Sequence, residues 1–199
     1  QHLRQTYKDN VPDFDQVFDE VSRTIIEQIE ALGRIASEFS HFARMPKSQL
    51  EPCNVNAILT ESINLFEQNS QIHFATTFEA NIPTILADRE ELRRAFINII
   101  RNGIQAMENR GEMRIGTMRK ADGVQVTIRD HGPGIPEEIK GRLFEPNFST
   151  KTDGMGLGLA IVKKTVEDLG GEVMIESAQN EGTTVVVFLP SQSKPSERA

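Results

Sequence analysis

The chain has 199 residues, 38% of them hydrophobic and 26% charged, which predicts a soluble globular protein of one ordinary domain with an appendage, or of two small domains. Its formal net charge of −7 argues against a broad nucleic-acid surface, which needs a basic excess, but allows a local basic site for a small anion. The single cysteine, Cys53, excludes an intrachain disulfide, and no apolar run approaches the roughly 18 residues of a transmembrane helix. We therefore expect a cytoplasmic chain and leave open an inner-membrane anchor upstream of it.

The first 45 residues carry a heptad pattern. Apolar residues recur at alternating steps of four and three from Phe14 to Phe42, with one interruption, which is typical of a long helix packed against one or more other helices. Residues 1–45 are therefore predicted to form a partial helical hairpin; an ordinary amphipathic helix folded onto its own domain is the alternative. The proline-bracketed polar stretch at 46–54 is predicted to be a linker.

Residues 55–190 are predicted to form a second unit in which strands come in pairs between helices. Because strands and helices do not alternate one for one, this order disfavours a doubly wound parallel sheet and favours an α+β sandwich. Residues 191–199 are predicted to be a flexible tail. Helices are expected at 55–66, at 88–107, and from the end of the glycine motif at 154–158 to about residue 169. Strands are expected at 71–80, 84–88, 112–120, 123–130, 172–177 and 183–190. A glycine-rich loop is expected at 131–154.

The stretch GMGLGLAIVKK sets Gly154, Gly156 and Gly158 at alternate positions before a predicted helix. Glycines placed in this way let the backbone amides of a helix start approach phosphate groups, although glycines also mark turns and close packing. A dinucleotide fingerprint needs its glycines directly after a strand in a strand-helix-strand unit. Here they follow a long loop, which argues against a dinucleotide.

Polar side chains at two other places suit the two ends of a nucleotide. Asn98 and Asn102 share one helix face, and their carboxamide oxygens can complete a Mg²⁺ shell otherwise filled by waters and phosphates; a solvated polar face is the alternative. Asp130 ends a strand just before Gly132 and Gly134. An aspartate there can accept a hydrogen bond from the amino group of adenine while the glycines let the base lie against backbone; a simple turn start is the alternative.

The order of the motifs NIIRNG, DHGPGIP, LFEPNFSTK, GMGLGL and GTTVVVFLP resembles the N, G1, F and G2 boxes and the closing strand of sensor histidine kinases. These belong to the Bergerat-fold (GHKL) ATPases, together with type II topoisomerases, mismatch-repair clamps and heat-shock chaperones. The resemblance covers residues 55–190 and implies a two-layer α/β sandwich with a mixed sheet and three main helices. The preceding EALGRIASEFSHFARMP resembles the second dimerisation helix of nitrogen-regulation kinases of the NtrY type.

The resemblance implies a role for each matching residue. Asn102 would be the magnesium ligand, Asn98 its companion in the phosphate site, and Asp130 the partner of the adenine amino group. The other implied ATP-binding residues line the base, the mobile lid or the triphosphate: Gly132 and Gly134 beside the base, Phe144 and Phe148 as lid anchors, Lys151 as a phosphate-neutralising or merely solvated lysine, Gly154, Gly156, Leu157 and Gly158 along the phosphates, and Thr183 on the adenine side.

The implied activity is transfer of the γ-phosphoryl group of Mg-ATP to a histidine and onward to an aspartate of a response regulator, in a homodimer joined through the hairpin. The family places the acceptor in a stretch of the form His-Glu-(Ile or Leu)-(Lys or Arg)-Asn-Pro, which neither His2 nor His41 matches. No catalytic residue is therefore assigned, and the chain is expected to be a fragment that cannot autophosphorylate. We expect no nucleic-acid partner.

Two other classes of function stay open. An ATP-hydrolysing clamp of the same fold would need a glutamate as general base where this chain has Asn98, an amide that cannot act as a base. A non-catalytic ATP-binding or scaffold domain would act by association through the heptad helix. One departure from the family pattern is Gly103, which stands where alanine is usual and is expected to weaken the helix by about 0.5–1 kcal/mol without abolishing binding.

Overall fold

The computed structural model describes residues 17–26, 29, 33, 49–67, 70–149 and 156–191. The chain divides into two compact units, Gln1–Met45 and Pro46–Ala199. In the first unit, residues 17–26 are helical, and the heptad side chains Phe18 and Ile25 are 47% and 52% exposed. Positions 29 and 33 are also described and helical; the rest of the predicted hairpin lies outside the described residues, as does the predicted tail beyond residue 191. Among the described residues, no helix combines the length and the apolar character needed to cross a membrane.

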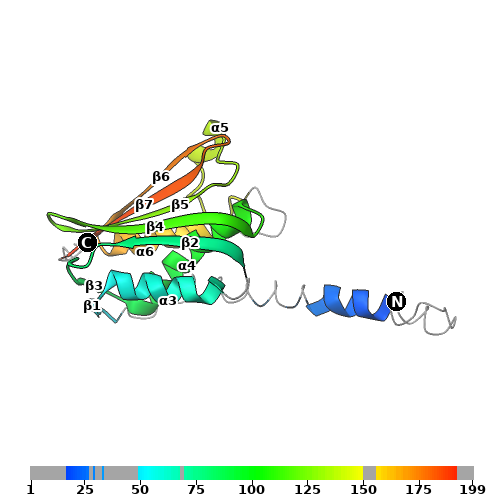
Figure 1. Ribbon diagram of the computed structural model, residues 1–199, viewed down its shortest axis with the longest axis horizontal. Helices are drawn as coiled ribbons and strands as arrows, with labels where there is room; N and C mark the ends of the chain where they lie inside the picture. The colour runs from blue at the N-terminus through cyan, green and yellow to red at the C-terminus, as the bar shows by residue number, and fades with distance from the viewer. Residues whose placement is uncertain are drawn as a thin grey trace. The chain divides into compact units, whose positions relative to one another are not determined.

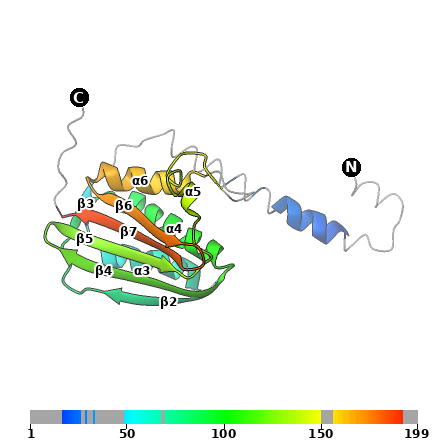
Figure 2. The same ribbon diagram turned by 90° about the horizontal axis from the view of Figure 1, so that it is seen from above.

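The second unit is built on a five-stranded mixed sheet with the strand order β2-β4-β5-β7-β6, which Figure 2 shows from above. Strands β2 (Gln71–Phe78) and β4 (Arg110–Lys120) are parallel. The other neighbouring pairs, formed by β4, β5 (Gly123–Asp130), β7 (Gly182–Pro190) and β6 (Glu172–Ala178), are antiparallel. The hairpin predicted around the Asp-Gly pair is confirmed, since β4 and β5 are joined by a tight turn at that point.

Three long helices cover one face of this sheet, so that the unit has two layers (Figure 1). They are α3 (Val55–Glu67), α4 (Arg89–Ala106) and α6 (Gly158–Asp168), and α4 packs against both of the others. A short helix, α5 (Glu137–Lys140), interrupts the stretch that was predicted to be an irregular glycine-rich loop. The α+β prediction of a mixed sheet with three main helices is confirmed.

A small second sheet pairs β1 (Glu51–Cys53) with β3 (Ile85–Ala87) in antiparallel register. Strand β1 falls within residues 46–54, which were predicted to be a linker because Pro46 and Pro52 bracket a polar stretch. The pairing buries Cys53, which is 2% exposed and whose thiol donates to the carbonyl oxygen of Ala87 at 3.5 Å. Burial raises the pKa of this thiol, so Cys53 acts as a small apolar side chain.

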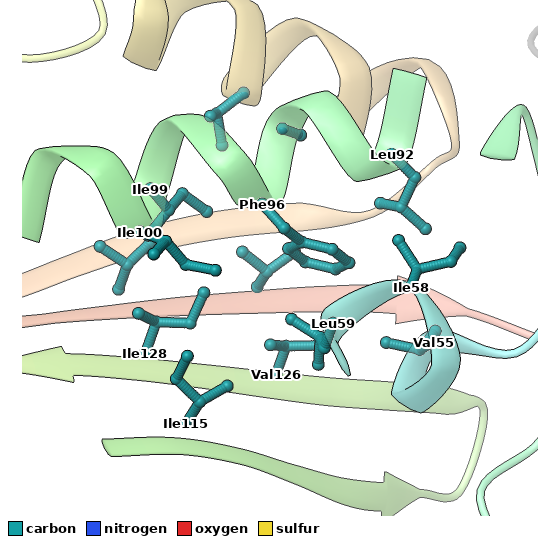
Figure 3. Close-up of a cluster of buried hydrophobic side chains, with 14 of the residues drawn as sticks. Val55, Ile58, Leu59, Leu92, Phe96, Ile99, Ile100, Ile115, Val126 and Ile128 are labelled. Carbon is teal, nitrogen blue, oxygen red and sulfur yellow. The ribbon is translucent and has the colours of Figure 1, made fainter. Parts of the chain in front are cut away.

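The hydrophobic core lies between the helices and the sheet (Figure 3). Phe96 of α4 lies at the centre of this core and is 1% exposed. Burial of such a ring stabilises the fold by about 1.5–3 kcal/mol. Strands β4, β5 and β7 contribute buried residues at alternate positions, which fixes their register. The labelled neighbours of Phe96 in Figure 3 are Val55, Ile58, Leu59, Leu92, Ile99, Ile100, Ile115, Val126 and Ile128.

The start of α4 is fixed by Asp88. Its Oδ1 accepts hydrogen bonds from the backbone amides of Glu90 and Glu91, both at 3.1 Å, and its Oδ2 accepts from the amide of Gln49 at 3.0 Å. Two amide groups that the helix itself cannot satisfy are thus paired, as is typical of an N-cap. The same carboxylate ties the segment before β1 to the helix that carries both asparagines of the predicted site.

We expect Asp88→Ala to lower the free energy of unfolding by about 1–2 kcal/mol, because it removes the cap of α4. Glu90→Ala is the matched control: Glu90 lies in the same helical turn and its side chain pairs with Arg93 at the surface, at 3.2 Å. Its loss is expected to cost at most about 0.5 kcal/mol. Urea unfolding followed by circular dichroism measures both, and equal losses would contradict the role of the cap.

Candidate functional site

Asp130 is the last residue of β5, and its side chain is buried, with 7% of the residue exposed. Its Oδ1 accepts two backbone hydrogen bonds, from the amide of Gly132 at 2.9 Å and from that of Thr183 at 3.2 Å. Burial raises the pKa of Asp130, while these two donors and the nearby His131 and Arg129 oppose that rise. The fold thus holds a carboxylate at a strand end with one oxygen already occupied.

The second carboxylate oxygen, Oδ2, is directed toward α4, where a Cβ added at Gly103 would lie 3.5 Å from it. In the described part of the chain, both hydrogen bonds of this side chain go to Oδ1. No buried side-chain nitrogen or oxygen of the described residues lacks a partner, so Oδ2 keeps contact with solvent. It is therefore available to accept a hydrogen bond from a bound molecule.

Asn98 and Asn102 lie one turn apart on α4, as predicted from their spacing. Asn98 is only 8% exposed. A Cβ added at Gly158, the first residue of α6, would lie 3.8 Å from Cγ of Asn98. The structure thus brings the asparagine face of α4 to the start of α6.

The start of α6 presents backbone amides without a capping side chain. The cap position is Leu157, which is 5% exposed and has no polar group, and the first turn contains no acidic residue. The first amide groups of a helix lack partners within it and carry a partial positive charge. This end of α6, next to Asn98, is therefore suited to an anion such as a phosphate group.

Gly156 must be a glycine in this structure. Its φ of +65° is strained for other residues, and an added Cβ would lie 2.5 Å from the carbonyl carbon of Phe148. The end of the loop after α5 therefore lies directly on the glycine motif. Lys151 and Gly154, which were also predicted to bind the nucleotide, lie outside the described residues.

The two predicted lid anchors are half-buried, and each ring carries a cation over its face. Nζ of Lys163, on α6, lies 5.6 Å from the centre of the Phe144 ring, and the guanidinium of Arg142 lies 4.4 Å from that of Phe148. Contacts of this kind are worth about 0.5–1 kcal/mol at exposed sites. Phe144 thereby connects the loop to the helix that follows the glycine motif.

The beginning of the same loop rests on the turn between β6 and β7. The amide of Asn180 donates to the carbonyl oxygen of Pro133 at 2.7 Å. Gly134 has a φ of +72°, and an added Cβ would lie 2.8 Å from the carbonyl carbon of Ala178. Gly132 approaches α4, since its Cβ would lie 3.0 Å from that of Ala106. Both glycines next to Asp130 thus permit close backbone packing.

Ser177 belongs to this site and was not among the predicted residues. Its hydroxyl accepts from the amide of Ile135 at 2.9 Å and lies 3.0 Å from Oγ1 of Thr183, which is 9% exposed. Ser177 and Thr183 are register partners in β6 and β7. No local pattern distinguishes Ser177 from an ordinary strand serine, so only the strand pairing could have identified it.

Gly103, expected to weaken its helix, lies within a continuous α4. A Cβ there would come within 2.6 Å of Cε of Met113, a residue that is 0% exposed, and within 3.2 Å of Cβ of Asp130. The methionine methyl group thus occupies the space in which an alanine side chain would lie. Packing against Met113 offsets part of the helix propensity that glycine loses.

The described residues contain no group of three or more histidine, cysteine, aspartate or glutamate side chains able to enclose a metal ion. The available donors are the carboxamides of Asn98 and Asn102. Mg²⁺ is usually held by one or two protein ligands together with waters and substrate phosphates. The donor set therefore fits an ion that binds with a phosphorylated ligand.

The fold agrees with the comparisons with known proteins. Residues 87–193 match the family described as "Histidine kinase-, DNA gyrase B-, and HSP90-like ATPase". The chain therefore belongs to this ATPase family. Among its members, the chain is 30% identical over 208 residues to nitrogen regulation protein NtrY of Azorhizobium caulinodans, an alignment that covers 99% of this chain and 27% of that protein.

Two solved structures have the same fold. Full-length ShkA in complex with AMPPNP superposes with a TM-score of 0.75 at 25% identity, covering 89% of this chain and 40% of that one. Histidine kinase ThkA in complex with response regulator protein TrrA gives a TM-score of 0.72 at 27% identity, covering 88% and 51%. The predicted Bergerat fold and the likeness to sensor histidine kinases are confirmed. The chain spans 27–44% of the length of the curated relatives that it matches.

Proposed function

We propose that this chain is the ATP-binding catalytic region of a two-component sensor histidine kinase. It would bind Mg-ATP and transfer the γ-phosphoryl group to a histidine on a dimerisation helix, from which an aspartate of a response regulator receives it. The observation that carries the proposal is the Asp130 carboxylate, which is buried at a strand end with Oδ1 held by two backbone amides and Oδ2 left to accept.

At the adenine end, Oδ2 of Asp130 would accept a hydrogen bond from the exocyclic amino group. The base would lie against backbone beside Gly132 and Gly134, where a side chain would collide with Ala106 or Ala178. Thr183 would support the same edge of the base. Burial removes part of the solvation of the charged carboxylate and so raises the pKa of Asp130, and a donor from the ligand would supply part of what burial removes.

At the phosphate end, the first amides of α6 and the backbone at Gly156 and Gly158 would contact the triphosphate. Asn102 would be the protein ligand of Mg²⁺, with Asn98 beside it; the ion would neutralise phosphate charge. Lys151 and Gly154 belong to the same proposed set. Because Asn98 is an amide, it cannot activate a water as a glutamate could, which favours phosphoryl transfer over hydrolysis. The contribution of the chain is then positioning and charge neutralisation.

The proposed partners follow from the relatives. The complex of ThkA with TrrA supports a response regulator as the acceptor of the phosphoryl group. The likeness to NtrY supports a role in nitrogen regulation. In the whole protein, residues 1–45 would contribute to a dimerisation hairpin that joins two copies. The chain would work in the cytoplasm.

Calorimetric titration with a non-hydrolysable ATP analogue tests the nucleotide site. We expect one molecule to bind per chain in the presence of Mg²⁺, and much weaker binding when EDTA removes the ion. Absence of binding under both conditions would favour the non-catalytic scaffold instead. Phosphate release from ATP at a steady rate, without any protein acceptor, would favour the hydrolysing clamp.

Incubation with γ-labelled ATP tests the kinase activity. We expect no acid-labile phosphohistidine on this chain alone, because neither His2 nor His41 stands in an acceptor motif. Addition of a separate fragment that carries the acceptor helix is expected to give labelled histidine on that fragment. Stoichiometric label at His2 or His41 would contradict the assignment of the acceptor to another segment.

A further inference from the structure

The Ser177 hydroxyl joins three segments that are separate in the sequence. It accepts from the amide of Ile135 at 2.9 Å, donates to the carbonyl oxygen of Gly182 at 2.8 Å, and lies 3.0 Å from Oγ1 of Thr183. Ile135 lies just after the loop residues that rest on the β6–β7 turn, and Thr183 is the register partner of Asp130. One hydroxyl therefore connects the start of the loop to the strand pair that holds the carboxylate.

The hydrogen-bonding capacity of Ser177 determines the direction of its bond to Thr183. A serine hydroxyl has one hydrogen to donate and two lone pairs with which to accept. The hydrogen is used on Gly182, whose carbonyl oxygen can only accept. One lone pair is used on Ile135, so the remaining lone pair must receive the hydrogen of the Thr183 hydroxyl. The Thr183 hydroxyl can therefore act only as an acceptor toward any other partner.

Two acceptors consequently belong to register-partner residues, at the end of β5 and the start of β7. One is Oδ2 of Asp130, and the other is Oγ1 of Thr183, whose own backbone amide is bonded to Oδ1 of the same carboxylate at 3.2 Å. A purine with an amino group at position 6 has two hydrogens to donate there. A purine with an oxygen at that position presents an acceptor to two acceptors, which is unfavourable.

We propose that Ser177 is a positioning and specificity-determining residue of the nucleotide site. By accepting the Thr183 hydrogen, it makes Thr183 an acceptor that favours a 6-amino purine over a 6-oxo purine, and by accepting from Ile135 it couples the start of the loop to that choice. This inference rests on the proposed ATP site. It adds a residue that does not touch the nucleotide and acts through Thr183.

Calorimetry with non-hydrolysable ATP and GTP analogues, each with Mg²⁺, tests the proposal. Ser177→Ala is expected to weaken binding of the ATP analogue about tenfold, the size of one hydrogen bond, and to reduce the preference over the GTP analogue by a similar factor. Ser177→Thr keeps the hydroxyl and is expected to retain both the affinity for the ATP analogue and the preference over the GTP analogue. Glu176→Ala is the matched control, since this neighbouring strand residue is exposed and is expected to bind as the wild type does.

Thr183→Val, alone and combined with Ser177→Ala, tests whether Ser177 acts through Thr183. We expect the double variant to have the same nucleotide preference as Thr183→Val; independent, additive losses of preference would overturn the proposal. Amide exchange at Ile135 is expected to accelerate in ligand-free Ser177→Ala but not in Ser177→Thr, which separates this bond from general unfolding. A wild type that binds neither analogue would overturn the ATP site itself. A wild type that binds, together with an unchanged Ser177→Ala, would overturn only the role of Ser177.

Discussion

Replacement of Asp130 by asparagine is expected to weaken binding of a non-hydrolysable ATP analogue by about 10- to 100-fold, the range for loss of a hydrogen bond to a charged group. Binding is expected to weaken because the backbone amides of Gly132 and Thr183 determine how the asparagine side chain is oriented. Both need an acceptor, so the amide oxygen must take the place of Oδ1. The amide nitrogen then takes the place of Oδ2 and presents hydrogens to the hydrogens of the adenine amino group.

The same substitution is expected to leave the ligand-free fold as stable as the wild type at pH 7, or to stabilise it. Burial raises the pKa of Asp130 in the folded state above its unfolded value, so its stabilising contribution is complete below the unfolded pKa and is lost as the pH rises through the folded pKa. Above the folded pKa, the folded protein therefore carries a poorly solvated charge that asparagine lacks. The stability advantage of the variant should shrink as the pH is lowered toward the folded pKa.

Titration calorimetry and urea unfolding at several pH values measure the two effects separately. Asp122→Asn is the matched control, because it makes the same chemical change at an exposed residue beside the other end of β5. It is expected to change neither affinity nor stability beyond about 0.5 kcal/mol. Wild-type affinity in Asp130→Asn would remove the main support for an adenine site at this strand end.

The parts of the fold that could be predicted from sequence are those whose signal is local. Residues Val124, Val126 and Ile128 alternate toward the core, and Asp88 marks the start of α4 by a capping pattern that needs only its own helical turn. Strand β1 could not be predicted in this way. It has three residues, and it is stable because it pairs with β3, which lies more than thirty residues away, and buries Cys53 against it.

The residues of the candidate site divide in the same way, into those with a local sequence signal and those whose role depends on distant partners. Asp130, the asparagines of α4 and the glycines could be predicted because each motif is continuous and the motifs follow the order seen in sensor histidine kinases. The function of Ser177 depends on three partners that only the folded sheet brings together. Gly103 was judged by helix propensity alone, because the sequence does not show that the methyl group of Met113 fills the space beside it.

Gly134→Ala is expected to lower the free energy of unfolding by about 1–3 kcal/mol and to weaken nucleotide binding at the same time. The φ of +72° is unfavourable for alanine, and the new Cβ would collide with the backbone of Ala178, which cannot move without disturbing the β6–β7 turn. Displacement of this backbone breaks the bond from Asn180 to Pro133 and pulls Ile135 away from Ser177. Amide exchange at Asn180 and Ile135 is therefore expected to accelerate more than exchange in the central strands.

Gly141→Ala separates this effect from the general consequences of adding a methyl group to the same loop. Gly141 has a helical φ of −61°, and a Cβ there would meet nothing within 4 Å. Because alanine restricts the unfolded chain more than glycine does, this control is expected to be neutral or to stabilise the protein by up to about 1 kcal/mol. Calorimetric affinity for the ATP analogue should be unchanged in Gly141→Ala and reduced in Gly134→Ala. Equal behaviour of the two variants would show that the backbone contact between Gly134 and the β6–β7 turn does not hold the loop in place.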